Sequence, residues 1–160
     1  MELASTALQH AEVHLKASQL DGVFGQVLMF LALGNGGLND AALRRLTNLH
    51  EATNNTRWAT LRYMLGPFVD DFGGRLNFRS DLFTLVINKR YPDPKPALLR
   101  LAQYYEALWR ADASSVATQA IMRLEVPHDR FRALDMWKET GALLSDPNYT
   151  TAVYPDHALE

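Results

Sequence analysis

The sequence predicts a mainly α-helical protein with one small β-hairpin. Apolar residues recur at helical spacing along most of the chain, as they do through residues 24–31. Two short apolar runs flank Gly73-Gly74, which is the pattern of a hairpin. A connector at residues 91–96 interrupts both patterns, because its three prolines favour extended backbone. We therefore expect two helical regions, with the hairpin in the first.

The composition is that of an ordinary globular protein. Of 160 residues, 48% are hydrophobic and 21% are charged, and the formal net charge is -2. This balance predicts no strong attraction to nucleic acid or to an acidic membrane. The chain has no cysteine, which excludes disulfides and thiolate metal sites. No apolar run approaches the roughly 18 residues of a membrane-spanning helix, and the N-terminus lacks a basic signal region, so we expect a cytoplasmic protein.

Two helices are predicted at the start of the first region. Residues 2–20 place apolar side chains on one helical face. A second helix is expected from Asp21, a favourable N-cap residue, and it ends at Asn35-Gly36-Gly37. The glycine cluster follows no strand and precedes no Lys-Ser/Thr pair, so we interpret it as a helix stop and not as a phosphate-binding loop.

Two further helices follow before the hairpin. Asn39 or Asp40 caps a short one, and Asn54-Asn55-Thr56 offers a cap for the next, which carries Trp58 on its apolar side. Gly66-Pro67 ends that helix, since glycine favours a helix terminus and proline prevents continuation.

The hairpin pairs Phe68-Val69 with the run from Leu76 to Phe78. Asp70-Asp71 lies beside the glycine turn, so we interpret these carboxylates as turn residues and not as a catalytic pair. Three helices followed by a two-stranded wing describe a winged helix, which we place at residues 22–91, after an N-terminal helix at 1–21. Its expected core residues are Trp58, Pro67, Phe68 and Phe78.

The second region, residues 97–154, is predicted to form antiparallel helical hairpins. A strongly amphipathic helix comes first and carries Trp109. Further helices are expected to begin at Asp112, Pro127, Asp135 and Asp146, and short turns between helices are typical of hairpins. Trp109 and Trp137 are expected in the core. Residues 155–160 form a tail that ends in Leu159-Glu160, a pair that cloning commonly leaves.

Motifs of catalysis and metal binding are missing from the sequence. It contains no GxxxxGK[ST], GxGxxG, GxSxG or HExxH pattern. His10 and His14 lie one helical turn apart, but no third ligand has matching spacing, so an exposed helix face is favoured over a metal site. A DNA-binding winged helix needs a basic third helix, and here Arg57 and Arg62 are offset by the acidic pair in the wing. We expect no catalytic residue, no metal and no cofactor in this chain.

Residues 65–91 resemble the winged helix of STAND-class NTPases of the NACHT type, such as telomerase-associated and nephrocystin-like proteins with WD or tetratricopeptide repeats. The shared pattern is a helix with tryptophan, a Pro-Phe strand, a glycine turn, a Leu-x-Phe strand, and a helix that ends in Arg90-Tyr91. The likeness continues through Leu98–Tyr105 and through Arg123–Pro147, and it covers most of the chain from Phe24 to Tyr154.

The resemblance implies a regulatory role. In this family the winged helix closes over the ATPase core, and a histidine after the second wing strand senses the nucleotide. The matching residue here is Ser80, between Arg79 and Asp81, and serine lacks the charge and reach of imidazole. Under the resemblance, these three residues face any nucleotide. Ser80 has the simpler alternative of capping the helix that it opens.

We expect a non-catalytic segment that packs between an ATPase core and a repeat sensor. ATP or ADP would bind only an upstream domain that this chain does not contain. The alternative is a stand-alone winged-helix protein that binds DNA or serves as a protein-interaction adaptor, with a helical dimerisation tail. Protein is the expected partner in both cases except the DNA-binding one, and no membrane contact is expected.

Overall fold

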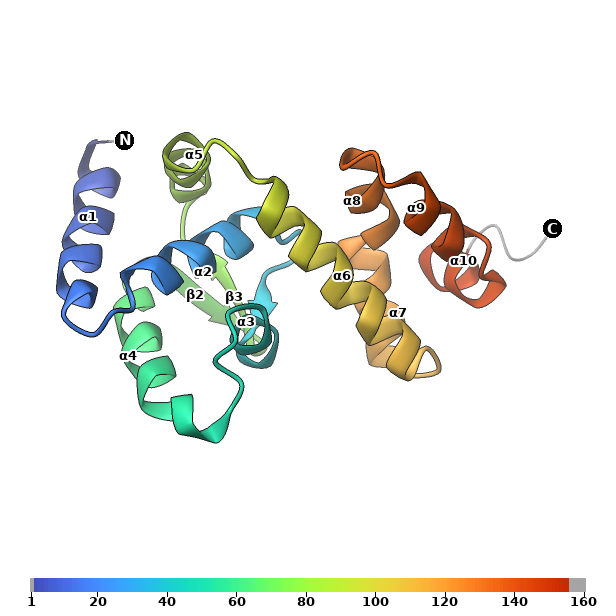
Figure 1. Ribbon diagram of the computed structural model, residues 1–160, viewed down its shortest axis with the longest axis horizontal. Helices are drawn as coiled ribbons and strands as arrows, with labels where there is room; N and C mark the ends of the chain where they lie inside the picture. The colour runs from blue at the N-terminus through green and yellow to red at the C-terminus, as the bar shows by residue number, and fades with distance from the viewer. Residues whose placement is uncertain (1, 156–160) are drawn as a thin grey trace. The chain divides into compact units, whose positions relative to one another are not determined.

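A computed structural model describes residues 2–155 of the chain (Figure 1). The predicted tail from residue 156 onward, including Leu159-Glu160, lies outside the described residues. The chain divides into two compact units, Met1–Pro94 and Lys95–Glu160, and the division falls within the proline-rich connector. The described part is mainly helical with one small antiparallel sheet.

The first unit holds five α-helices and all three described strands. In chain order its elements are α1 (Glu2–Lys16), α2 (Asp21–Leu33), β1 (Leu38–Asn39), α3 (Asp40–Leu46), a 3-10 turn (Ala52–Asn54), α4 (Asn55–Leu65), β2 (Val69–Phe72), β3 (Arg75–Phe78) and α5 (Asp81–Arg90). Helix α2 packs against α1, α5 and β3.

The predicted hairpin is confirmed, and it has a third strand that was not predicted. Strands β2 and β3 pair antiparallel, with Val69 opposite Phe78. Strand β1 pairs with the other edge of β3, where Leu38 lies opposite Leu76, so the sheet order is β1-β3-β2. Two residues are too few to show the alternation by which a strand is recognised in a sequence.

Capping explains where several helices of this unit begin. Asn39 caps α3 by accepting a hydrogen bond from the Ala42 amide at 2.7 Å, as expected. Ser80 caps α5 by accepting from the Leu82 amide at 3.3 Å. The prediction for Asp21 was wrong in detail, because it lies in the first turn of α2, where its negative charge still favours the helix N-terminus.

The core of the first unit combines the apolar sides of its helices with one face of the sheet. Trp58 and Phe68 are buried, and the Phe68 ring packs edge-on against Phe24 and Phe83. Phe78 is half-buried beside Phe83. The expectation of Pro67 in the core is corrected: it is exposed, because it follows the last turn of α4 on the surface.

The second unit consists of helices throughout its described part. They are α6 (Lys95–Asp112), α7 (Val116–Glu125), α8 (Pro127–Ala133), α9 (Trp137–Leu144) and α10 (Pro147–Val153). Helix α6 packs against α7 and α8, α8 packs against α9, and α10 packs against α7 and α9. Their shared core includes Leu101, Tyr105, Met122, Phe131 and Tyr149.

Two of the predicted helix starts in this unit are confirmed. Pro127 opens α8, and Asp146 caps α10 by accepting from the Asn148 amide at 2.9 Å. The other two were wrong. Asp112 is the last residue of α6, and Ser115 caps α7 instead. Asp135 lies in the left-handed region with φ 58, where it makes the turn before α9.

The two tryptophans of the second unit differ in their surroundings. Trp109 is buried, and its indole N–H donates to Asp146 at 2.9 Å. The expectation of Trp137 in the core is corrected, because its side chain is 62% exposed. Helix α9 buries Thr140 and Leu143, and at about 100° per residue the first position of the helix lies roughly a quarter-turn away from that face.

Candidate functional site

The residues aligned with a nucleotide-sensing position make contacts within the hairpin and α5. Arg79 follows β3, and its Nε lies 2.9 Å from Asp70 Oδ1 and donates to the Val69 carbonyl at 3.1 Å. The Ser80 hydroxyl is the α5 cap, and Asp81 is exposed in the first turn of that helix. Arg79 thus serves the hairpin and Ser80 serves the helix, and their contact with a nucleotide stays a prediction.

The arginines around α4 and the wing are paired within the first unit. Arg62 Nε donates to Asp40 at 3.1 Å, and its guanidinium lies 3.5 Å from Asp71. Asp40 also accepts from the Trp58 indole at 3.2 Å. The Arg75 guanidinium donates to the Gly36 carbonyl at 2.7 Å. These contacts bind the positive charge of the module to its own acceptors.

A large apolar groove runs along one side of α1. It has a volume of about 880 Å³, and it lies between α1 and the end of α4 with the turn that follows. Leu3, Ala7 and His10 line it from α1, while Tyr63 and Phe68 line it from the other side. Leu3 and Tyr63 are 88% and 82% exposed. Exposed apolar surface of this kind is typical of a site that binds another protein.

A cluster of charged and polar groups lies on the other side of α1, where it meets the end of α5. Glu12 accepts hydrogen bonds from the Arg90 guanidinium and, at 3.1 Å, from the Tyr91 hydroxyl. Burial raises the pKa of Tyr91, and the neighbouring Glu12 carboxylate raises it further. Tyr91 also lies against Gly25 of α2, where an added Cβ would stand 2.6 Å from its hydroxyl oxygen. We call this set the Glu12 clamp: Glu12, Gly25, Arg90 and Tyr91.

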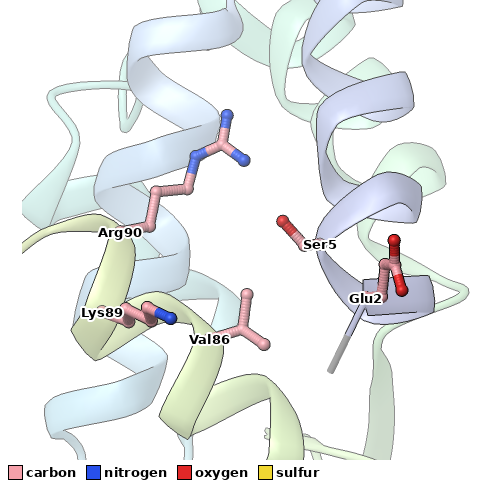
Figure 2. Close-up of a pocket in the computed structure, with 5 residues that line it drawn as sticks. All are labelled: Glu2, Ser5, Val86, Lys89 and Arg90. Atoms are coloured by element: carbon pink, nitrogen blue, oxygen red, sulfur yellow. The ribbon is translucent and has the colours of Figure 1, made fainter.

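Next to the Glu12 clamp, α1 and α5 separate and leave an open cavity of about 410 Å³. Figure 2 shows Ser5 on α1 and Val86 on α5 on either side of this gap, with Arg90 beside it. Glu2 and Lys89 complete the lining. A carboxylate and two cations at one rim offer no single charge preference to a ligand.

The second unit contains a buried polar cluster around His128. The imidazole is fully buried, its Nδ1 lies 2.9 Å from the Tyr149 hydroxyl, and its Nε2 lies 2.9 Å from the Tyr154 hydroxyl. Burial lowers the pKa of His128, so the neutral imidazole is favoured. A neutral imidazole donates through one nitrogen and accepts through the other, which suits two hydroxyl partners.

A buried ion pair lies near this cluster. Arg130 donates to the Glu125 carboxylate at 2.6 Å, and both side chains are almost fully buried. The guanidinium also lies over the Tyr105 ring, 5.9 Å from its centroid. No nucleophile or open cavity adjoins the pair among the residues that line the described pockets, so its place is architectural.

Three features bear on metals and membranes. Within residues 2–155, no group of three His, Cys, Asp or Glu side chains is arranged to hold a metal ion. His10 and His14 are exposed, and their rings contact each other edge-on at 4.5 Å. In the same part of the chain, no helix combines the length and the apolar character needed to cross a membrane.

Sequence reasoning missed the Glu12 clamp, the His128 cluster and the α1 groove. Glu12 and Arg90 lie 78 residues apart, so no local spacing links them. The resemblance did single out Arg90-Tyr91 as the end of a helix, which was the one available signal. His128 gave no signal either, because its tyrosine partners come from a different helix and from the residue after it.

Comparison with known proteins returns no match to this chain. No family model, no curated protein and no solved structure is significantly similar to it. The functional argument therefore depends on the geometry of the two units.

Proposed function

We propose that this chain is a non-catalytic regulatory segment of a larger STAND-class NTPase, where it couples an ATPase core to a repeat sensor. In this proposal the first unit is a winged helix and the second is a set of helical hairpins. The segment acts as a two-state element, docked or released, whose balance is shifted by a partner that prefers one state.

The connectivity of the first unit is the observation that supports this proposal most strongly. From α2 to β3 the elements run helix, strand, helix, helix, strand, strand, and the sheet order is β1-β3-β2. This is the order in which a winged helix arranges its strands. It is more specific than helix content, because it fixes which strand lies in the middle of the sheet.

The pairing of arginines supports a protein partner over DNA. A winged helix that binds DNA presents cations to the phosphates, and each phosphate contact adds to the salt dependence of binding. Here Arg62 faces Asp40 and Asp71, while Arg79 faces Asp70. The open apolar groove beside α1 is in turn the kind of surface that another protein covers.

A titration of labelled duplex DNA, followed by fluorescence anisotropy at low and at high salt, separates the two candidate functions. We expect weak binding without a preferred sequence. The double variant Asp40→Asn with Asp71→Asn releases Arg62 and adds two units of positive charge, so it should bind DNA more tightly than the unmodified chain. Tight binding by the unmodified chain, with a steep loss at high salt, would favour a DNA-binding protein.

The coding sequence upstream of Met1 tests the family assignment. A reading frame that continues upstream and encodes Gly-x-x-x-x-Gly-Lys-Ser/Thr supports a coupling segment, since that motif holds the nucleotide phosphates. An upstream stop codon in frame, with no such motif before it, would contradict the assignment. The longer chain should then hydrolyse ATP, while residues 1–160 should not.

A further inference from the structure

Helix α1 is attached to the first unit by few contacts. Its buried side chains are Leu8, Ala11 and Leu15, which follow one stripe at i, i+3 and i+7. Its other large apolar residues, Leu3 and Val13, are exposed. Helix α1 packs against α2 and α5, and its blue ribbon lies at the margin of this unit in Figure 1.

The Glu12 clamp is the polar part of this attachment. Glu12 lies one residue after Ala11, so its carboxylate reaches Arg90 and Tyr91 while the stripe stays buried. Tyr91 is in turn held by its close approach to α2 at Gly25. The receiving side of the clamp therefore belongs to α2 and α5, and only the carboxylate comes from α1.

Open space lies on both flanks of α1. The groove of about 880 Å³ follows the flank that faces α4, and the cavity of about 410 Å³ follows the flank that faces α5. A helix in the interior of a domain is normally enclosed by close-packed neighbours on each side. Helix α1 instead lies on a narrow seat with free volume beside it.

The turn after α1 contains a strained residue. Gln19 adopts φ 55, in the left-handed region that glycine favours, and its amide donates to the Lys16 carbonyl at 3.1 Å. The next residue, Leu20, is buried at the start of α2. Release of α1 would relax the turn at Gln19 without moving the anchored Leu20.

We propose that α1 is a detachable helix that occupies a helix-binding surface formed by α2 and α5. Its competitor is an amphipathic helix from a protein partner, with apolar side chains at i, i+3 and i+7 and a carboxylate at i+4. This chemistry reproduces Leu8, Ala11, Leu15 and Glu12. The proposal concerns the first unit alone, and it does not require the coupling role described above.

Hydrogen exchange of the unmodified full chain tests whether α1 detaches. Amides protected by α1 should show at least about tenfold lower protection than those of α2, because they open without the rest of the unit. The same loss should not reach α5. Equal protection of α1 and α2 would overturn the proposal, since it would mean that the two helices open only together.

A labelled peptide with the sequence of residues 2–16 tests the docking surface. In the full chain, Glu12→Gln weakens the resident helix, because it removes a charged hydrogen-bond partner of Arg90 and Tyr91. The peptide should therefore bind this variant about tenfold more tightly than the unmodified chain. A peptide that itself carries Glu12→Gln should lose that gain.

The matched control is Glu51→Gln in the full chain. It makes the same change of charge in the same unit, at an exposed residue outside α1 and α5, and it should leave peptide affinity unchanged. Failure of the peptide to bind the Glu12→Gln chain would overturn the proposal, as would equal gains from Glu12→Gln and Glu51→Gln.

Discussion

The two units keep their charged groups in different places. In the first unit, ion pairs such as Arg62 with Asp40 lie near the surface and join segments far apart in the chain. In the second unit, the pair of Arg130 with Glu125 is buried and joins residues five apart. Surface pairs contribute little to stability and can exchange partners, whereas a buried pair is costly to break. The comparison assigns switching to the first unit and rigidity to the second.

The same contrast appears in the hydrogen bonds of the aromatic residues. Tyr91 lies at the end of α5 and binds a carboxylate from another helix, which a competitor could replace. Tyr149 is fully buried and binds His128 inside the second unit. Burial is the main cause that raises the pKa of Tyr149, so its hydroxyl stays neutral at any ordinary pH. The difference lies in access, because only the first contact is open to a partner.

The largest effect should come from the buried ion pair. Arg130→Met leaves the Glu125 carboxylate buried without its strongest partner, and it should lower the free energy of unfolding of the second unit by about 3–5 kcal/mol. Urea unfolding followed by the indole signal of Trp109 measures this loss.

The double variant Glu125→Leu with Arg130→Met is the control for that loss. It removes both charges and should recover most of the stability, because an apolar pair of similar size needs no compensation. If the double variant is as unstable as the single one, packing and not charge accounts for the effect.

A smaller effect should come from Gly25 in the first unit. Gly25→Ala places a Cβ 2.6 Å from the Tyr91 hydroxyl oxygen, and the displaced ring should cost about 1–3 kcal/mol. Thermal unfolding of the full chain gives the loss. Adding Tyr91→Phe removes the nearest atom and should recover part of it, whereas additive losses would show that the two residues do not meet.

The cap of α10 should matter less. Asp146→Ala removes the acceptor for the Asn148 amide and for the Trp109 indole, and it should cost about 1–2 kcal/mol. Asp146→Asn keeps an acceptor and should lose less. The hydrogen bond from Trp109 also holds the pKa of Asp146 below its ordinary value, so this contribution to stability should disappear only in acid.

The smallest effect should come from mild acidification of the second unit. Burial lowers the pKa of His128, so the unfolded chain binds a proton more readily than the folded one. Stability should be full above a pH of about 6.5, the ordinary value, and should fall as the pH decreases toward the folded-state value. His128→Gln should flatten this part of the profile, and an unchanged profile would assign it to other groups.

The sequence predicted the elements better than it predicted their contacts. The hairpin, the caps at Asn39 and Asp146 and the start of α8 at Pro127 depend on neighbouring residues, so local chemistry was enough. Strand β1 and the Glu12 clamp depend on partners from distant segments. Trp137 shows a third limit, since a large apolar side chain was assigned to the core without regard to its position around α9.

The candidate site was the least predictable part. Arg79 and Ser80 could be named from a resemblance, yet their partners, Asp70 and the Leu82 amide, were visible only in the fold. The groove beside α1 could not be predicted at all, because it depends on how far α1 lies from the end of α4. Sequence periodicity assigns a face to each helix but does not set the spacing between helices.

Calorimetric titration of ADP into the 160-residue chain tests the central claim most directly. The account predicts no saturable heat, because the Arg79 guanidinium serves Asp70 and Val69 and the Ser80 hydroxyl serves α5. Stoichiometric binding of ADP that Arg79→Ala abolishes would contradict it, since the chain would then hold a nucleotide site of its own.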